Sequence, residues 1–437
     1  MEQQQLDHQL VRELHTRFGK RLSEQRRSGV IAATMTLDDE RQYAHSVIAD
    51  VMREYLEEAM AQGRELPTRE EEERLVRAVH AAQYSAGPLQ PLLDNPDVEN
   101  INIQGGRVFV KYTGGKKEEV PPLVGSSAEL VQLVEQLAVY AGVNSRSWSQ
   151  TDPLLDIRMP GGERLAAIHP TMTGDRQPAL SIRRSSLGKV FLHELQANGT
   201  VTEEAAQFLR AAVKARKNIV VAGATDAGKT TLLRALANEI PPEERIITIE
   251  RSLELGLDEY EDLHPDILVL EERLANTEGE GAISQGKLLE RSLRHDADRV
   301  IVGEVLGGEA IQMLKAMSQG TDGSLSTLHA NSSEEVFNRI ATYALEAAER
   351  LPIEATHMLM ASALHFVVFI KKVRDPFTGE KRRRIASIRE VNGFDGGRVS
   401  SSEVFKLGPG GQLMAAAPIS CLDDLAEFDY IPGEVWV

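Results

Sequence analysis

The apolar and polar residues of the chain follow three patterns in succession. In the first, which runs from the N-terminus to about residue 86, apolar residues recur at helical spacing among charged ones, as at Leu6, Leu10, Val11 and Leu14. This pattern predicts a helical N-terminal arm over residues 1–86. A solvated helical arm is the simpler interpretation of the alternating charges, and an arm that binds a partner is the alternative.

In the second pattern, apolar residues alternate with polar ones, as in β-strands. Ile101 precedes a glycine-rich turn at residues 104–107 and Val108 follows it, which predicts a β-hairpin. We predict a smaller N-terminal α+β domain over residues 87–187 and a hinge over residues 188–200. The other elements expected in this domain are an amphipathic helix over 130–141, a second hairpin over 157–168 and a strand over 179–183.

From residue 201 onward, short apolar runs alternate with amphipathic helical stretches. This alternation is typical of an α/β fold with a mostly parallel sheet. We predict an α/β domain over residues 201–437, in which strands with basic turns form a C-terminal extension from about residue 366. The strands are expected at 219–222, 245–249, 266–270, 299–302 and 324–327, and the helices at 203–215, 229–238, 286–294, 308–317 and 333–345.

The first candidate functional motif lies between the first of these strands and the helix that follows it, in the stretch KNIVVAGATDAGKTTLL (217–233). It has the G-x-x-x-x-G-K-T spacing of a phosphate-binding loop (P-loop). The glycines let backbone N–H groups turn toward phosphate oxygens, Lys229 reaches the β- and γ-phosphates, and the Thr230 hydroxyl can hold Mg²⁺. The spacing can arise by chance, but a strand before it and a helix after it favour nucleotide binding. The residues predicted to bind ATP are Gly223, Ala224, Thr225, Asp226, Ala227, Gly228, Lys229, Thr230 and Thr231.

Composition and charge narrow the functional classes. The formal net charge of −17 weighs against a nucleic-acid partner, because an acidic surface repels a phosphate backbone. The single cysteine, Cys421, excludes a disulfide framework and a multi-cysteine zinc site, which fits a reducing cytoplasm. The N-terminus lacks the apolar core of a secretory signal, and the longest apolar stretch, residues 358–370, is too short to span a bilayer. We therefore expect a cytoplasmic protein without a transmembrane segment, in contact with a membrane only through a protein or a surface.

Hydrolysis requires a carboxylate that helps to hold Mg²⁺ and a group that orients the attacking water. Glu250 ends the apolar run RIITIE and Glu304 ends the run RVIVGE. A glutamate at a strand end is often simply exposed, yet two of them after a P-loop favour a catalytic role. His329 lies in a stretch of small residues, GTDGSLSTLHAN (320–331), and by pattern alone it is more typical of a structural histidine.

Together these motifs resemble those of the type II/type IV secretion superfamily of ATPases, most of all the tight-adherence (Flp) pilus assembly ATPases of the CpaF/TadA type. Besides a Walker A loop at 223–230, the chain has stretches similar to the family's Asp box (247–255), Walker B motif (293–309) and His box (320–331). The resemblance extends from residue 87 to about residue 405, and the preceding residues match only loosely.

The resemblance implies a RecA-like P-loop NTPase domain and an Mg²⁺-dependent ATPase. By it, Lys229 and Thr230 hold phosphate and Mg²⁺, and His329 senses the γ-phosphate. Glu250 and Glu304 become the candidates for the water-activating and Mg²⁺-linked carboxylates. Their division of labour stays open, although we place Glu304 with Thr230 at the metal.

The resemblance also implies partners and motion. In this family arginines of the smaller domain approach the nucleotide, so Arg164 and Arg183 are candidates to stabilise transition-state charge, with a surface salt bridge as the alternative for each. The chain is expected to form a homo-oligomer, a hexameric ring as in the family. Domain motion across the hinge would act on an inner-membrane platform protein, with the motor recruited peripherally to the inner face of the cell membrane. No direct contact with nucleic acid is expected.

Four positions depart from the family pattern. Arg251 stands where an acidic residue is usual, Ala297 replaces a proline, Leu306 an arginine and Thr321 the first histidine of the His box. These departures leave open a weak or partner-dependent ATPase. Two rival functions therefore stand beside the pilus motor: a DNA-transfer motor of the same superfamily, as in conjugation, and a nucleotide-switched scaffold that hydrolyses little ATP.

Overall fold

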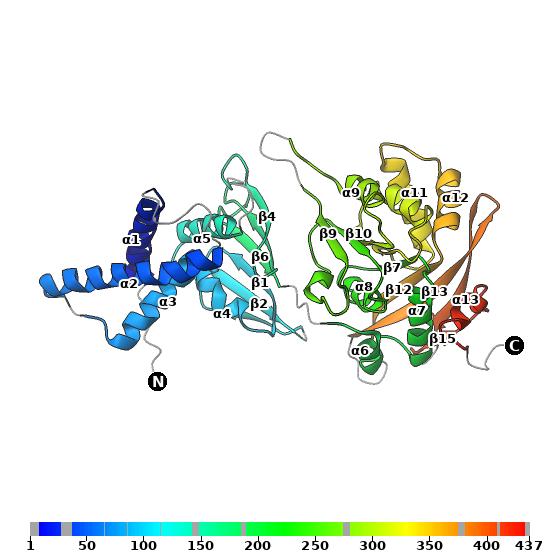
Figure 1. The fold of residues 1–437 in the computed structure, drawn as a ribbon, viewed down its shortest axis with the longest axis horizontal. Coiled ribbons are helices and arrows are strands. Elements are labelled where there is room, and N and C mark those ends of the chain that lie inside the picture. The colour runs from blue at the N-terminus through cyan, green and yellow to red at the C-terminus, as the bar shows by residue number, and fades with distance from the viewer. Residues whose placement is uncertain are drawn as a thin grey trace. The chain divides into compact units, whose positions relative to one another are not determined.

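The structure is a computed structural model, which describes residues 8–27, 37–64, 66–84, 86–113, 115–141, 148–184, 189–273, 280–374, 381–408 and 411–432. The chain forms two compact units, Met1–Ser186 and Leu187–Val437 (Figure 1). Each unit is described by itself.

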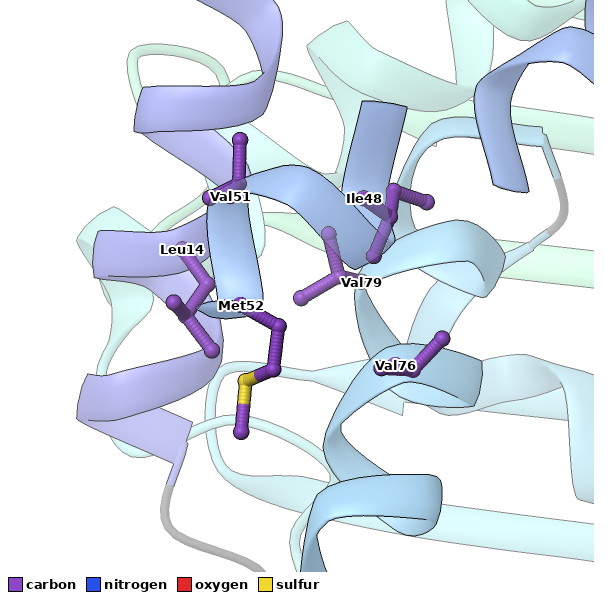
Figure 2. Close-up of a pocket in the computed structure, with 6 residues that line it drawn as sticks. All are labelled: Leu14, Ile48, Val51, Met52, Val76 and Val79. Carbon is purple, nitrogen blue, oxygen red and sulfur yellow. The ribbon is translucent and has the colours of Figure 1, made fainter. Parts of the chain in front are cut away.

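The N-terminal unit begins with three helices, α1 (His8–Arg27), α2 (Leu37–Ala61) and α3 (Arg69–Tyr84), which contact one another in every pair. Phe18 and Val47 lie in their shared apolar core. The charged residues of the predicted arm therefore cover the outside of a small bundle. Figure 2 shows a small hollow between the helices whose lining is entirely apolar: Leu14, Ile48, Val51, Met52, Val76 and Val79.

An antiparallel sheet of six strands, in the order β3-β2-β1-β6-β5-β4, follows the bundle in sequence. Both hairpins predicted from the alternation are present, and β3 is an additional edge strand. One face of the sheet packs against η1 (Gly87–Leu89), α4 (Gln90–Leu93) and α5 (Ser127–Tyr140). The strands are β1 (Val98–Gln104), β2 (Arg107–Tyr112), β3 (Lys117–Val120), β4 (Leu154–Arg158), β5 (Arg164–Ile168) and β6 (Ala179–Arg183).

The C-terminal unit is built on a sheet of nine strands in the order β15-β14-β13-β12-β7-β11-β10-β8-β9. From β12 to β9 neighbouring strands are parallel, and β13 to β15 add an antiparallel extension. The strands are β7 (Ile219–Gly223), β8 (Ile246–Glu250), β9 (Ile267–Glu271), β10 (Arg299–Val305), β11 (Leu325–His329), β12 (Phe366–Arg374), β13 (Lys381–Asp395), β14 (Arg398–Leu407) and β15 (Leu413–Ala415).

Helices cover both faces of this sheet and make three layers. The reason is visible in β7, where Ile219 and Val221 enter one apolar core while Val220 and Ala222 enter the other. The first core is completed by α6 (Leu192–Ala197), α7 (Glu203–Lys214), α8 (Lys229–Ala237) and α13 (Leu422–Ala426). The second is completed by α9 (Gln285–Ser292), α10 (Glu309–Met317), α11 (Glu335–Glu346) and α12 (Ile353–Ala363).

Every strand and helix expected between residues 201 and 345 is present, and two other segments differ from expectation. The segment 188–200, predicted as a hinge, contains α6, whose Leu192 and Leu195 are buried in the core of the C-terminal unit. The apolar stretch 358–370 is divided between the end of α12 and the start of β12. Among the helices of the described residues, none combines the length and apolar character that crossing a lipid bilayer requires.

Candidate functional site

The carboxyl ends of the parallel strands bring the predicted motif residues to one edge of the large sheet. β7 ends at Gly223, β8 at Glu250 and β11 at His329, and Glu304 is the penultimate residue of β10. His329 stands directly opposite Gly223 in the register of β11 with β7. Because parallel strands end at the same edge, residues far apart in sequence meet there.

The P-loop joins β7 to α8 through two glycines. Gly223 lies so close to the carbonyl oxygen of Ile370 on β12 that a Cβ atom would clash with it. Gly228 precedes α8 with a φ of 100°, which side chains rarely permit. The loop therefore opens onto the N-terminus of α8, where the first N–H groups and the helix dipole favour an anion.

Lys229 is nearly buried at the centre of this edge, with 7% of its surface exposed. Its ammonium lies 3.1 Å from Nδ1 of His329 and 3.7 Å from Oε1 of Glu304, and it donates to the carbonyl oxygen of Ala224 at 3.3 Å. His329 Nε2 is in turn 2.9 Å from Glu304 Oε1. A cation, a carboxylate and an imidazole from three separate sequence motifs thus form one cluster beside the P-loop.

A β-bulge in β10 precedes the end of the strand and includes Glu304. The register of β10 with β11 shifts between Val302 and Val305, so Gly303 and Glu304 together stand opposite Thr327. The Thr327 hydroxyl donates a hydrogen bond of 2.7 Å to the Gly303 carbonyl oxygen. Bulges turn side chains away from the regular alternation of a strand, and this one brings Glu304 within reach of Lys229.

Glu250 is buried beside the same bulge, with 3% of its surface exposed. Its Oε2 accepts hydrogen bonds from the backbone N–H groups of Glu254 at 2.7 Å and Leu255 at 3.0 Å. A Cβ atom on Gly303 would lie 2.8 Å from Glu250 Cγ, so glycine is required at this contact. Glu250 thus holds the loop after β8, whereas Glu304 faces the lysine of the P-loop.

Further acids surround this pair. Glu272 donates its backbone N–H to the Glu250 carbonyl oxygen at 2.8 Å. Burial raises the pKa of the Glu272 carboxyl, an effect that the charge of Arg251 opposes and that of Glu309 reinforces. Glu309 itself accepts hydrogen bonds of 2.6 and 2.9 Å from two backbone N–H groups that follow β10. The loop after Glu304 is therefore fixed by a carboxylate as well.

Arg164 and Arg183 lie in the N-terminal unit, directly opposite each other on β5 and β6. Arg158, which is not among the predicted site residues, stands opposite Arg164 on β4. Strand alternation places all three on the face away from the buried Leu165 and Ile182. Guanidinium groups bind phosphate oxygens well, so a row of three on one face is compatible with phosphate binding. Its approach to a nucleotide stays a prediction.

The four departures from the family pattern occupy different surroundings. The buried Thr321 hydroxyl donates to a carbonyl oxygen at the end of α10 at 2.7 Å, before β11 begins and therefore at the edge of the sheet opposite the P-loop. Ala297 packs against the second apolar core. Arg251 and Leu306 are exposed near the site, immediately after β8 and β10. Of the four, only Arg251 and Leu306 therefore lie at the carboxyl edge of the sheet, where the candidate site is.

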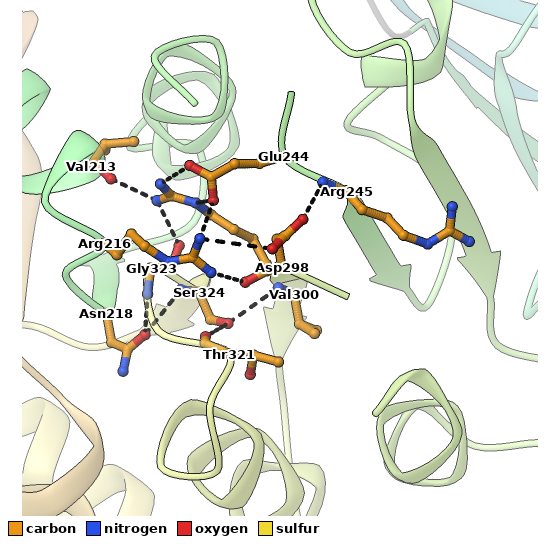
Figure 3. Close-up of polar contacts among 11 residues, drawn as sticks. Val213, Arg216, Asn218, Glu244, Arg245, Asp298, Val300, Thr321, Gly323 and Ser324 are labelled. Atoms are coloured by element: carbon orange, nitrogen blue, oxygen red, sulfur yellow. Dashed lines mark hydrogen bonds and ion pairs between the residues drawn. The ribbon is translucent and has the colours of Figure 1, made fainter. Parts of the chain in front are cut away.

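The amino edge of the sheet carries a polar network of its own (Figure 3). Arg299 is fully buried and makes two hydrogen bonds, of 2.8 and 2.6 Å, to the carboxylate of Glu244. Asn218 accepts from the backbone N–H groups of Gly323 and Ser324, each at 2.9 Å. These bonds fix where β7, β10 and β11 begin, and so the positions of their opposite ends.

The described residues contain no group of three or more His, Cys, Asp and Glu side chains that could hold a metal ion without further ligands. Mg²⁺ does not require one, because it typically binds one or two protein oxygens and completes its shell with phosphate oxygens and water. Thr230 in the first turn of α8 and Glu304 beside Lys229 supply oxygens of this kind.

Two contacts to the P-loop come from outside the predicted motifs. Lys372 on β12 and Arg383 on β13 pair with the carboxylate of Asp226 at 2.5 and 3.0 Å. From the sequence, Lys372 and Arg383 are recognisable only as members of the basic turns in the C-terminal extension, and nothing there indicates a contact with Asp226. Their meeting depends on the pairing of β12 with β7 and with β13, which no local pattern encodes.

Comparison with known proteins agrees with this arrangement. The family described as type II/IV secretion system protein matches residues 87–404. A protein of Mycobacterium tuberculosis named "Putative conjugal transfer protein" is 31% identical over 349 residues, which cover 78% of this chain and 94% of that protein. The type IV secretion system protein PtlH of Bordetella pertussis is 34% identical over 310 residues, which cover 65% of this chain and 88% of PtlH.

Among solved structures, the chain is similar to the pilus retraction motor PilT with bound ADP. The TM-score is 0.50 at 16% identity, with 78% of this chain and 86% of PilT covered. At this identity the likeness concerns the fold alone. It confirms the predicted combination of a RecA-like P-loop domain with a smaller N-terminal domain.

Proposed function

Because the chain belongs to the type II/IV secretion system protein family, we propose that it is the ATP-hydrolysing motor of a pilus assembly or secretion machine. The observation that carries the proposal is the cluster of Lys229, Glu304 and His329 beside the P-loop. ATP binding and hydrolysis would move the smaller domain against the ATPase domain. That motion would act on an inner-membrane platform protein at the inner face of the cell membrane.

In this mechanism the phosphates of ATP replace the internal partners of Lys229. The ammonium that lies near Glu304 and His329 turns to the β- and γ-phosphates, and the backbone N–H groups of the P-loop bind the same oxygens. Glu304, which lies 2.9 Å from His329 Nε2, would stay beside the phosphates as an Mg²⁺ ligand, and the imidazole would register whether the γ-phosphate is present. Glu250 keeps the loop and the bulge in place.

Thr230 and Glu304 would hold Mg²⁺ together with the phosphates. The ion supplies positive charge against the phosphate oxygens as negative charge develops on them. Arg164 and Arg183 would add charge from the smaller domain, and a homo-hexameric ring would bring each site into contact with a neighbour. The box motifs support assignment to the tight-adherence (Flp) pilus motors of the CpaF/TadA type.

The mycobacterial relative's name supports a second candidate, a DNA-transfer motor of the same superfamily. The net charge of −17 weighs against direct contact with DNA. Binding of the full-length chain to single- or double-stranded DNA that weakens steeply with added salt would favour the conjugation motor. DNA that stays unbound at low salt would favour the pilus or secretion motor.

The test of the main proposal is ATP turnover by the full-length protein over a range of protein concentrations, with Lys229→Ala and Glu304→Gln as controls. A ring motor predicts turnover per subunit that rises with concentration and is lost in both variants. ATP binding without turnover above the level of the variants would favour a nucleotide-switched scaffold. Loss of ATP binding in the native sequence would overturn both interpretations.

A further inference from the structure

The P-loop is packed along its length against the ribbon formed by β12 and β13. Its first glycine, Gly223, contacts the carbonyl oxygen of Ile370 on β12. A Cβ atom on its second glycine, Gly228, would lie 3.0 Å from Cδ of Arg383 on β13. The shape of the loop is therefore set by the ribbon as well as by the glycines.

Asp226 occupies the middle of the loop and has a φ of 59°, in the left-handed region that favours glycine. Its carboxylate lies between Lys372 Nζ, at 2.5 Å, and Arg383 Nη2, at 3.0 Å. All three side chains are between one third and one half exposed, and ion pairs of that kind contribute little to stability. The arrangement therefore calls for an explanation other than fold stability.

Charge supplies that explanation. A carboxylate within a loop that must receive a triphosphate would repel it, since both are negative. On the other side, Lys372 and Arg383 stand directly opposite each other on their strands, where two cations are unfavourable without an anion between them. Asp226 and the cation pair thus neutralise each other while the loop awaits its ligand.

We propose that Lys372 and Arg383 are positioning residues for nucleotide binding, which act through Asp226. They hold the left-handed turn of the P-loop and cancel the carboxylate charge that the phosphates of ATP would otherwise meet. The proposal rests on the proposed function in that it requires ATP to bind at this loop.

The test is a titration of the full-length protein with a fluorescent ATP analogue, first in the native sequence and then in four variants. We expect Lys372→Gln and Arg383→Gln to raise the Kd for the analogue about fivefold or more, because the carboxylate is then poorly neutralised. Asp226→Asn removes the charge that they cancel, so adding it to Arg383→Gln should return the Kd to within about twofold of the native value. Arg382→Gln is the matched control, since strand alternation turns Arg382 to the other face of the ribbon, and its Kd should stay native.

Three results bear on the proposal separately. If Arg383→Gln weakens binding and Asp226→Asn does not restore it, Arg383 contacts the nucleotide directly and the proposal is wrong. An unchanged Kd in Arg383→Gln overturns it as well. Failure of the native protein to bind the analogue would instead contradict the proposed function. Thermal unfolding of each variant, expected to match the native protein, separates positioning from damage to the fold.

Discussion

The hydroxyl of Thr327 donates a hydrogen bond of 2.7 Å to the carbonyl oxygen of Gly303, across the bulge that includes Glu304. Strand pairing and the geometry of the candidate site therefore depend on the same side chain. A carbonyl group in this largely buried position that lost its donor would favour another backbone geometry, because buried polar groups are costly without partners.

Replacement of Thr327 by valine keeps the shape of this buried residue and removes the hydroxyl. We expect the turnover number for ATP to fall about tenfold while the affinity for ATP changes little, because the displaced Glu304 carboxylate takes part in the reaction rather than in binding. Steady-state turnover and a nucleotide titration measure the two quantities. Thr327→Ser keeps the donor and serves as the control; valine and serine variants of equal activity would show that the bond does not position Glu304.

Gly303→Ala tests the contact between the bulge and Glu250. The added methyl group would lie 2.8 Å from Glu250 Cγ in a packed interior, so we expect a loss of about 1–3 kcal/mol in the free energy of unfolding. Denaturant unfolding followed by circular dichroism measures it. The matched control is Gly286→Ala in α9, where the nearest atom to the new Cβ is 3.4 Å away and belongs to the flexible side chain of Gln312. The prediction fails if the two variants are equally stable.

The arginine row of the smaller domain can be tested through turnover. If Arg164 and Arg183 meet developing charge on the phosphates, alanine at either position should lower turnover by about 10³-fold. Arg107→Ala is the control, because this arginine lies on β2 of the same sheet, outside the row, and pairs with Glu119 at 2.9 Å. Variants of Arg164 and Arg183 that keep the activity of the Arg107 control would leave the row without a catalytic role.

A pH dependence is expected at His264, which is 2% exposed and whose Nε2 lies 2.9 Å from Oδ1 of Asn238 at the end of α8. Burial lowers the pKa of His264 from 6.5 to about 4, although the charge of Asp262 opposes this. The unfolded chain therefore takes up a proton near pH 6.5, where the folded protein does not. The contribution of His264 to the stability of the folded protein is therefore complete above pH 6.5 and declines as the pH falls toward 4.

When the pH is lowered from 7.5 to 5.5, His264 should reduce the free energy of unfolding by on the order of 1 kcal/mol. Denaturant unfolding at both pH values, compared with His264→Gln, isolates the effect, because every other titrating group is common to the two proteins. An equal pH dependence in both proteins would mean that the native state binds the proton as readily as the unfolded chain does.

Local patterns account for much of this structure. The P-loop was identifiable from the spacing of Gly223, Gly228 and Lys229, and the buried strands of the large sheet were identifiable from short apolar runs, because both signals lie within a few consecutive residues. Glu304 and His329 could be named as candidates for the same reason. Their contact depends on β10 and β11 lying side by side in the sheet, and a single stretch of sequence does not reveal which strands are neighbours.

The features that were not predicted depend on pairing between distant segments. The bulge at Gly303 is a shift of register between two strands, and the ion pairs of Asp226 require β12 to lie beside β7. The segment around Leu192 has the composition of a linker but packs as a helix, because an apolar core elsewhere in the chain covers it. Tertiary contacts thus determine each of these features. The bulge and the ion pairs have no local sequence signal, and the helix around Leu192 forms in spite of one.

The position of β7 has a consequence for the order of events during synthesis. This strand lies between β11 and β12, so Ile219 is paired with Leu325 on one side and Phe366 on the other. On the ribosome, the nucleotide loop emerges long before either neighbour exists, and non-local pairing of this kind is slow to form. In a nascent chain, the nucleotide-binding loop is therefore incomplete until β12 has left the exit tunnel and can pair with β7. Nucleotide capture then coincides with completion of the domain, and a truncated chain would not compete for ATP.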